Sequence, residues 1–134
     1  MDVKKVTQAV EKFGALLPEK PVWMLLMNRE GDVITQVGKY EHLFHSETML
    51  EDGSAAAWIQ SHSTSEIDLL DHLDHGNLQY SISVGTEGVF VILHIHGDYL
   101  LGMSYHSIGV KSLDALADGI VLHFREILDA LFDV

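Results

Sequence analysis

Three strand-length segments follow one another between residues 78 and 105, and only short turns separate them. The first, Leu78 to Val84, alternates apolar and polar side chains, which is typical of a half-exposed strand. The second, Val89 to Ile95, is almost entirely apolar, and the third runs from Tyr99 to Tyr105. Because turns this short join antiparallel neighbours, the pattern predicts a three-stranded meander.

A second pair of strands is expected near the N-terminus. Val22 to Met27 is an unbroken apolar run of strand length, which predicts a central strand buried on both faces. Residues 28–32 have turn chemistry, and Gly31 can adopt a positive φ there. The β-branched segment Val33 to Val37 then completes a hairpin.

Helical spacing of apolar residues predicts helices around these strands. The first helix ends at Pro18, and its apolar positions are Val3, Val6, Val10, Phe13, Leu16 and Leu17. A long C-terminal helix is expected to start with Ser112 as its cap, and its apolar stripe contains Leu113, Leu116, Ala117, Ile120, Val121, Phe124, Leu128 and Leu131.

The middle helix is less regular in sequence. Ser54 is a plausible N-cap, and one face of the helix would carry Ala55, Trp58, Ile59 and His62. Residues 63–65 weaken helical propensity, so either this helix continues or a second one starts at Ser65. In both cases Gly76 and Asn77 end it. Residues 38–52 are expected to be irregular.

The expected order is helix, hairpin, helix, meander, helix. This order predicts an α+β fold in which a five-stranded antiparallel sheet carries helices across its faces. With 134 residues, the chain has the usual size of one domain, and residues 1–134 are assigned to a single domain.

The charge is strongly acidic and unevenly distributed. Twenty Asp and Glu residues stand against eight Lys and Arg, giving a formal net charge of −12. No Lys or Arg occurs between Lys39 and Lys111, a segment that contains ten acidic residues. Nucleic acids and anionic membranes are therefore poor partners, whereas a protein with a basic surface is a suitable one.

The chain has no cysteine, which excludes disulfides, thiolate catalysis and cysteine-ligated metals. Its longest apolar run, Val22 to Met27, is far shorter than a membrane span, and no signal peptide is evident. These features predict a soluble cytoplasmic protein.

The element order and several segments resemble the roadblock/LC7 family, whose sandwich is profilin-like. An apolar strand leads into the turn of residues 28–32 and then into Val33-Ile34, similar to that family's opening hairpin. The alanine-rich segment Ala55-Ala56-Ala57 resembles its second helix. Leu78 to Val84 resembles its third strand, and Val89 to Leu93 and Tyr99 to Met103 resemble the fourth and fifth.

The resemblance implies a non-catalytic protein that forms homodimers and acts as an adaptor or regulator of a Ras-like small GTPase. It implies no cofactor and no metal. Carried over by position, the dimer or partner surface would include Trp58, Ile59, His62, Gln79 and Tyr80.

Two groups of histidines raise the alternative of a metal site. His94 and His96 share one face of a strand, where Asp98 or His106 could complete a site, and His72 and His75 lie at a helix end. Short spacings of this kind are common by chance in a chain with nine histidines. No catalytic motif of Ser, His or Asp accompanies them, so a metal-dependent enzyme is the third-ranked function.

Eight of the nine histidines lie in the segment that lacks Lys and Arg. Since histidine gains charge near pH 6.5, mild acid would reduce the local negative charge, and self-association or partner binding would strengthen toward pH 6. Ordinary solvated histidines are the alternative explanation.

A small-molecule sensor of profilin-, PAS- or GAF-like architecture is the second-ranked function, because such domains also place helices around a five-stranded sheet. A sensor requires a pocket with convergent polar groups. The strands here read as filled with apolar side chains, which favours the adaptor.

Overall fold

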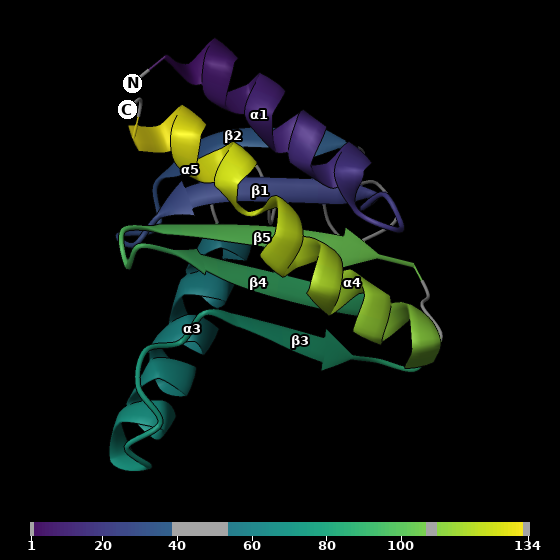
Figure 1. Cartoon of the computed structure of the whole chain (residues 1–134). Helices are drawn as coiled ribbons and strands as arrows, with labels where there is room; N and C mark the ends of the chain where they lie inside the picture. The colour runs from purple at the N-terminus through teal and green to yellow at the C-terminus, as the bar shows by residue number, and fades with distance from the viewer. Residues whose placement is uncertain (1, 39–53, 107–109, 133–134) are drawn as a thin grey trace.

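The computed structural model describes residues 2–38, 54–106 and 110–132 (Figure 1). The expected irregular segment lies outside the described residues, apart from Gly38, which closes a strand. The elements in chain order are α1 (Val3–Leu16), β1 (Trp23–Asn28), β2 (Val33–Gly38), α3 (Ser54–His72), β3 (Tyr80–Val84), β4 (Val89–Ile95), β5 (Tyr99–Tyr105), α4 (Val110–His123) and α5 (Arg125–Phe132).

The five strands form one antiparallel sheet in the order β2-β1-β5-β4-β3. The meander predicted from the sequence is confirmed, and β4 and β5 have the predicted bounds. The hairpin joins the meander because β1 pairs with β5, with Trp23 opposite Ser104 and Asn28 opposite Tyr99. β3 therefore lies at one edge of the sheet and β2 at the other.

Side chains of alternate strand residues enter two separate cores. α1, α4 and α5 cover one face of the sheet, and α3 covers the other (Figure 1). β1 contributes Met24 and Leu26 to the larger core and Trp23, Leu25 and Met27 to the smaller one. The prediction that this strand is buried on both faces is confirmed, since each of these five residues is at most 3% exposed.

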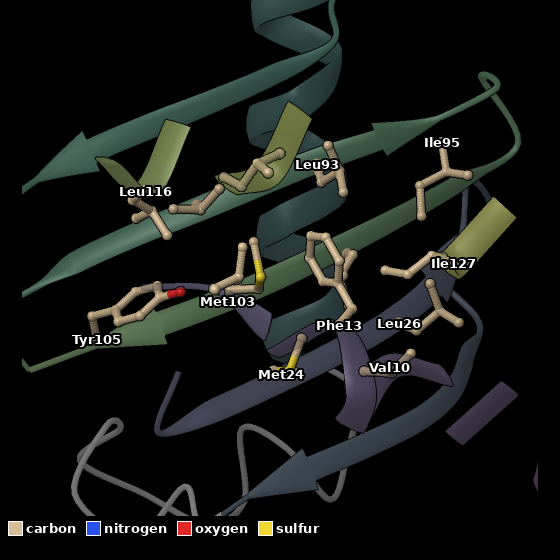
Figure 2. Close-up of a cluster of buried hydrophobic side chains, with 14 of the residues drawn as sticks. Val10, Phe13, Met24, Leu26, Leu93, Ile95, Met103, Tyr105, Leu116 and Ile127 are labelled. Atoms are coloured by element: carbon tan, nitrogen blue, oxygen red, sulfur yellow. The ribbon is translucent and has the colours of Figure 1, made fainter. Parts of the chain in front are cut away.

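The larger core lies between the sheet and the three helices on its face. Figure 2 shows Val10 and Phe13 of α1, Leu116 of α4 and Ile127 of α5 gathered in one cluster with side chains of the strands. Burial of apolar side chains contributes roughly 25 cal/mol per Å² of apolar surface, so burial of these side chains stabilises the packing of the three helices on the sheet.

α1 follows most of its sequence pattern, although Val3 and Leu16, which were expected on its apolar face, are 50% and 39% exposed. Val6, Val10 and Phe13 are its buried apolar residues. Asp2 caps the helix, because its carboxylate accepts hydrogen bonds from the backbone N–H groups of Lys4 at 3.1 Å and Lys5 at 3.3 Å. The helix stops before Pro18, as expected.

The C-terminal helix differs from its prediction in two ways. It starts at Val110 rather than after a Ser112 cap, and it divides at Phe124 into α4 and α5. The bend allows α5 to pack along α1, where Lys12 and Glu126 form an ion pair at 3.1 Å. Val121 was expected on the buried stripe but is 66% exposed.

α3 is one continuous helix, which resolves the alternative left open by residues 63–65. Thr64 and Ser65 donate hydroxyl hydrogen bonds to the carbonyls of Gln60 and Ser61, at 3.0 and 3.3 Å, so these residues bond to the helix instead of ending it. Asp74 and Gly76 adopt positive φ angles of 55° and 82° and end the helical path.

Close approach of α3 to the sheet depends on Gly102 of β5. A Cβ atom at this position would lie 2.9 Å from the Phe90 ring and 3.2 Å from Ile59 Cδ1. Gly31 adopts the predicted positive φ, at 92°, in the turn between β1 and β2. Within the described ranges, every helix falls short of the length and apolarity that crossing a bilayer requires.

Candidate functional site

β3 exposes an unpaired backbone edge. It pairs with β4 on one side and with no described strand on the other. The N–H of His94 donates to the Gln79 carbonyl at 2.8 Å, so residues 79, 81 and 83 direct their backbone groups toward β4. The alternation of an antiparallel ladder then directs the backbone groups of Tyr80, Ile82 and Val84 outward, where another strand could pair with them.

α3 carries an apolar stripe on its exposed side. Trp58 is 68% exposed, Leu69 is 58% exposed, and Leu73, just after the helix, is 52% exposed. At 3.6 residues per turn, these positions lie within about 60° of one another around the helix axis. In Figure 1 the C-terminal half of α3 extends past β3, the edge strand.

The five residues assigned to the interface from the sequence occupy three environments. Trp58, His62 and Gln79 are exposed, and Tyr80 is half-buried against the larger core. Ile59 is 6% exposed and packs in the smaller core, so it supports α3 from beneath. The face expected to carry Ala55, Trp58, Ile59 and His62 together is therefore split, because the buried side of α3 contains Ala55, Ala56, Ile59 and Ser63.

A groove of about 580 Å³ runs between α3 and the sheet beside this stripe. Trp58 and His62 line it from the helix, and Ser83 and Phe90 line it from the strands. Trp58 and Ser83 bring the helix and the edge strand to the same groove, and we call the open edge of β3, the stripe on α3 and this groove together the α3–β3 surface.

The α3–β3 surface is bordered by negative charge. Exposed or partly exposed acidic residues of α3 and its C-terminal end are Glu66, Asp68, Asp71 and Asp74. His62 forms an ion pair with Glu66 on the next turn of the helix when it is protonated. A partner with complementary positive charge would be steered toward this region.

The histidines expected as metal ligands occupy different environments. Neither ring nitrogen of His94, which is 6% exposed, has a hydrogen-bond partner among the described residues, whereas His96 is exposed. His72 Nδ1 lies 2.7 Å from the Asp68 carbonyl oxygen. In the described part of the chain, no three His, Asp or Glu side chains are arranged to hold a metal ion.

Burial changes the acid–base chemistry of two side chains. Burial, followed by the nearby Arg29 guanidinium, lowers the pKa of His94 from 6.5 to about 4. Burial, with Glu19 as the second cause, raises the pKa of Tyr105. His94 therefore does not contribute to a change of charge near pH 6, contrary to its inclusion among the eight histidines considered above.

The sequence prediction omitted two parts of the region. Leu69 and Leu73 continue the exposed stripe of Trp58, and their spacing of 11 and 15 residues from it was the available signal. Arg29 lines a cavity together with His94, although the two residues are 65 positions apart in the chain. No local pattern could have brought them together.

The fold has well-matched relatives among solved structures, although the sequence matches no model of a known family and no curated protein. The gliding protein MglB from Thermus thermophilus has a TM-score of 0.68 at 14% identity, covering 96% of this chain and 87% of its own. A structure described as MglB with tetrameric arrangement has a TM-score of 0.68 at 12% identity, covering 96% of this chain and 91% of its own. A Roadblock/LC7 domain from Streptomyces avermitilis has a TM-score of 0.66 at 10% identity, covering 90% of this chain and 92% of its own.

Proposed function

We propose that this chain, which has the roadblock/LC7 fold, is a non-catalytic protein-binding module that acts as a homodimeric adaptor or regulator of a Ras-like small GTPase. The observation that carries the proposal is the α3–β3 surface, where an apolar helix stripe adjoins an open strand edge. In this proposal residues 1–134 act as one domain in the cytoplasm.

Dimerisation through this surface would complete groups that are exposed in one chain. Pairing of β3 with its copy would satisfy the outward backbone groups of Tyr80 and Ile82. The two α3 helices would then bury Trp58, Leu69 and Leu73, which are exposed apolar side chains. Support comes from a structural neighbour described as MglB with tetrameric arrangement, in which more than one copy assembles.

The proposed GTPase partner rests on the roadblock/LC7 resemblance and on charge. The segment without Lys or Arg places acidic residues next to the α3–β3 surface, so a partner with a basic surface is favoured.

The test of self-association is the absolute mass in solution, measured by light scattering after size exclusion. We expect a dimer for the wild-type chain and a monomer for Trp58→Glu, because that substitution places a charge within the apolar stripe. Leu122→Glu is the matched control, since Leu122 is 74% exposed on α4, on the other face of the sheet. A wild-type monomer at the highest soluble concentration, at pH 7.5 and pH 6, would contradict the proposal.

The partner is tested separately with the Ras-like GTPases encoded in the same genome. Each is loaded with GDP or with a non-hydrolysable GTP analogue, and binding to the chain is measured by calorimetry. A regulator should distinguish the two nucleotide states and should lose binding in Trp58→Glu if the dimer is the binding unit. Equal absence of binding in both states for all of these GTPases would reject the GTPase role and leave the dimer intact.

The second candidate function is a small-molecule sensor. The cavity beside His94 favours it, because buried polar groups without hydrogen-bond partners among the described residues line a volume that is open to solvent on one side.

A further inference from the structure

A cavity of about 680 Å³ opens where the chain enters β3, beyond the C-terminal half of α3. Polar groups reach it from separate parts of the fold. They are Arg29 of the β1–β2 turn, Asp71 of α3, Gln79 and Tyr80 of β3, and His94 of β4. The volume lies within the range of roughly 300–1,000 Å³ that is usual for small-molecule sites.

His94 is the buried polar side chain of this cavity. Strand register places Met27, Leu100 and His94 in one row across the sheet, and Gln79 continues the row because its carbonyl accepts the His94 N–H at 2.8 Å. All four lie on the face covered by α3. His94 is only 6% exposed, and neither of its ring nitrogens has a hydrogen-bond partner among the described residues. Buried polar groups are normally satisfied, so this ring is suited to a hydrogen bond with a ligand.

Arg29 presents a second buried group to the same cavity. Its Nε is buried and has no hydrogen-bond partner in the described ranges. Its backbone is fixed on both sides, because its N–H donates to the Asp98 carbonyl at 3.1 Å and its carbonyl accepts from the Gln60 side chain. The backbone that carries the guanidinium is therefore fixed beside His94, which lowers the entropic cost of binding a ligand there.

We propose that this cavity binds a small organic carboxylate, with the Arg29 guanidinium as its ionic partner and the His94 ring as a second hydrogen-bond donor. A guanidinium is well matched to a carboxylate, since its planar N–H groups can bind both oxygens. Asp71 at the cavity repels a second negative group and attracts an ammonium group. The ligand class is therefore a monocarboxylate or an amino acid, not a dicarboxylate.

Binding of a carboxylate is coupled to a proton. His94 is neutral at pH 7 in the free protein, and an adjacent carboxylate favours its charged form. The other charged or titratable groups that line the cavity on this face are Arg29, which opposes protonation, Asp71 from α3 and His96 from the β4–β5 turn, whereas Tyr80 projects from the opposite face of β3. Ligand binding near pH 7 should take up a proton at His94, and affinity should rise as the pH is lowered from 7 toward 6.

The test uses three probes that share one 3-phenylpropanoyl skeleton. They are 3-phenylpropionate, L-phenylalanine, which adds an ammonium group, and the neutral 3-phenylpropanamide. Backbone amide shifts of the full chain are followed by NMR during titration at pH 7, and calorimetry in two buffers of different ionisation enthalpy measures proton uptake. We expect saturable shifts at Arg29, Gln79 and His94 with at least one carboxylate, and binding weakened by about tenfold or more for the amide. Preference for L-phenylalanine over 3-phenylpropionate would identify amino acids as the ligand class.

Matched variants locate the site. Arg29→Gln should weaken carboxylate binding by about tenfold or more. Arg125→Gln removes the same charge from an exposed position on α5 and should leave affinity within about twofold, because surface charges are well screened. Proton uptake should disappear in His94→Gln.

Three results would overturn the proposal. The first is that neither carboxylate produces saturable shifts. The second is equal affinity of the wild-type chain for the acid and the amide. The third is that Arg29→Gln and Arg125→Gln change carboxylate affinity equally. The acid–amide comparison needs only the wild-type chain, so it decides the question even if a variant does not fold. These results are read from ligand affinity and not from the mass of the chain in solution, so failure of this proposal can be distinguished from failure of the proposed function, although Gln79 belongs to both regions.

Discussion

His94 combines burial, an unsatisfied ring and a nearby cation, and these properties predict a pH-dependent stability. Its pKa is about 4 in the folded chain and 6.5 in the unfolded chain. Between these values the unfolded chain binds a proton that the folded chain does not. The free energy of unfolding should therefore fall as pH is lowered from 6.5, reaching a loss on the order of 3 kcal/mol near pH 4, and then level off.

Urea unfolding at pH 7.5, 6, 5 and 4 measures this loss. His94→Leu removes the titrating ring, so its free energy of unfolding should change less over this range than that of the wild type. His75→Gln is the control, because His75 is exposed beyond the end of α3 and should leave the wild-type slope unchanged. Parallel pH profiles for the wild type and His94→Leu would show that His94 is protonated normally in the folded chain.

Among the elements, α1 offers a direct measure of local helix energetics. Asp2→Ala removes the carboxylate that accepts from Lys4 and Lys5, and we expect a loss of about 1 kcal/mol in the free energy of unfolding. Asp2→Asn keeps a capping oxygen and should remain close to the wild type. The measurement is urea denaturation of the three chains at pH 7.5. Equal losses for the two variants would assign the effect to charge and not to the cap.

The strands were predictable because their signals are local. The alternation of Leu78 to Val84 and the short turns on each side of β4 predict pairing from neighbouring residues alone. The bend at Phe124 was not predictable, because the apolar spacing from Leu116 to Leu131 suits one straight helix. Packing of α5 against α1 decides that the chain bends there.

The candidate surface was predictable only in outline. Trp58, His62 and Gln79 are exposed as an interface requires, but the sequence did not indicate which side of α3 the sheet would cover. Small residues determine which side of α3 faces the sheet, since Ala55, Ala56 and Ser63 allow the helix to approach the strands while the bulky Trp58 remains outside. Arg29 and His94 meet only through the β1–β5–β4 register, which has no counterpart in any short stretch of sequence.

For the whole molecule, the net charge of −12 predicts opposite salt effects on two kinds of association. Two copies of the chain repel each other, so raising NaCl from about 0.05 to about 0.5 M should strengthen the dimer by screening that repulsion. Binding to a basic partner should weaken over the same range, because the attraction is screened. Sedimentation equilibrium measures the first, and calorimetry measures the second. A dimer that weakens with salt would indicate an interface held mainly by ion pairs.

The exposed histidines of α3 extend this argument to pH. His62 and His72 lie among Glu66, Asp68 and Asp71 on the exposed side of α3, where the acidic side chains of two copies would approach each other. The prediction that association strengthens toward pH 6 therefore concerns these exposed side chains. His94 instead lowers the free energy of unfolding as the pH falls.

The start of α1 and the end of α5 lie close together, on the face of the sheet opposite α3 (Figure 1). A fluorescent protein or a surface tether joined at either end would therefore stand clear of Trp58 and β3. Energy transfer between two differently labelled copies could then follow exchange of chains in real time. The same proximity makes the chain suitable for circular permutation, with a short linker between the present ends and new ends in the turn of residues 85–88.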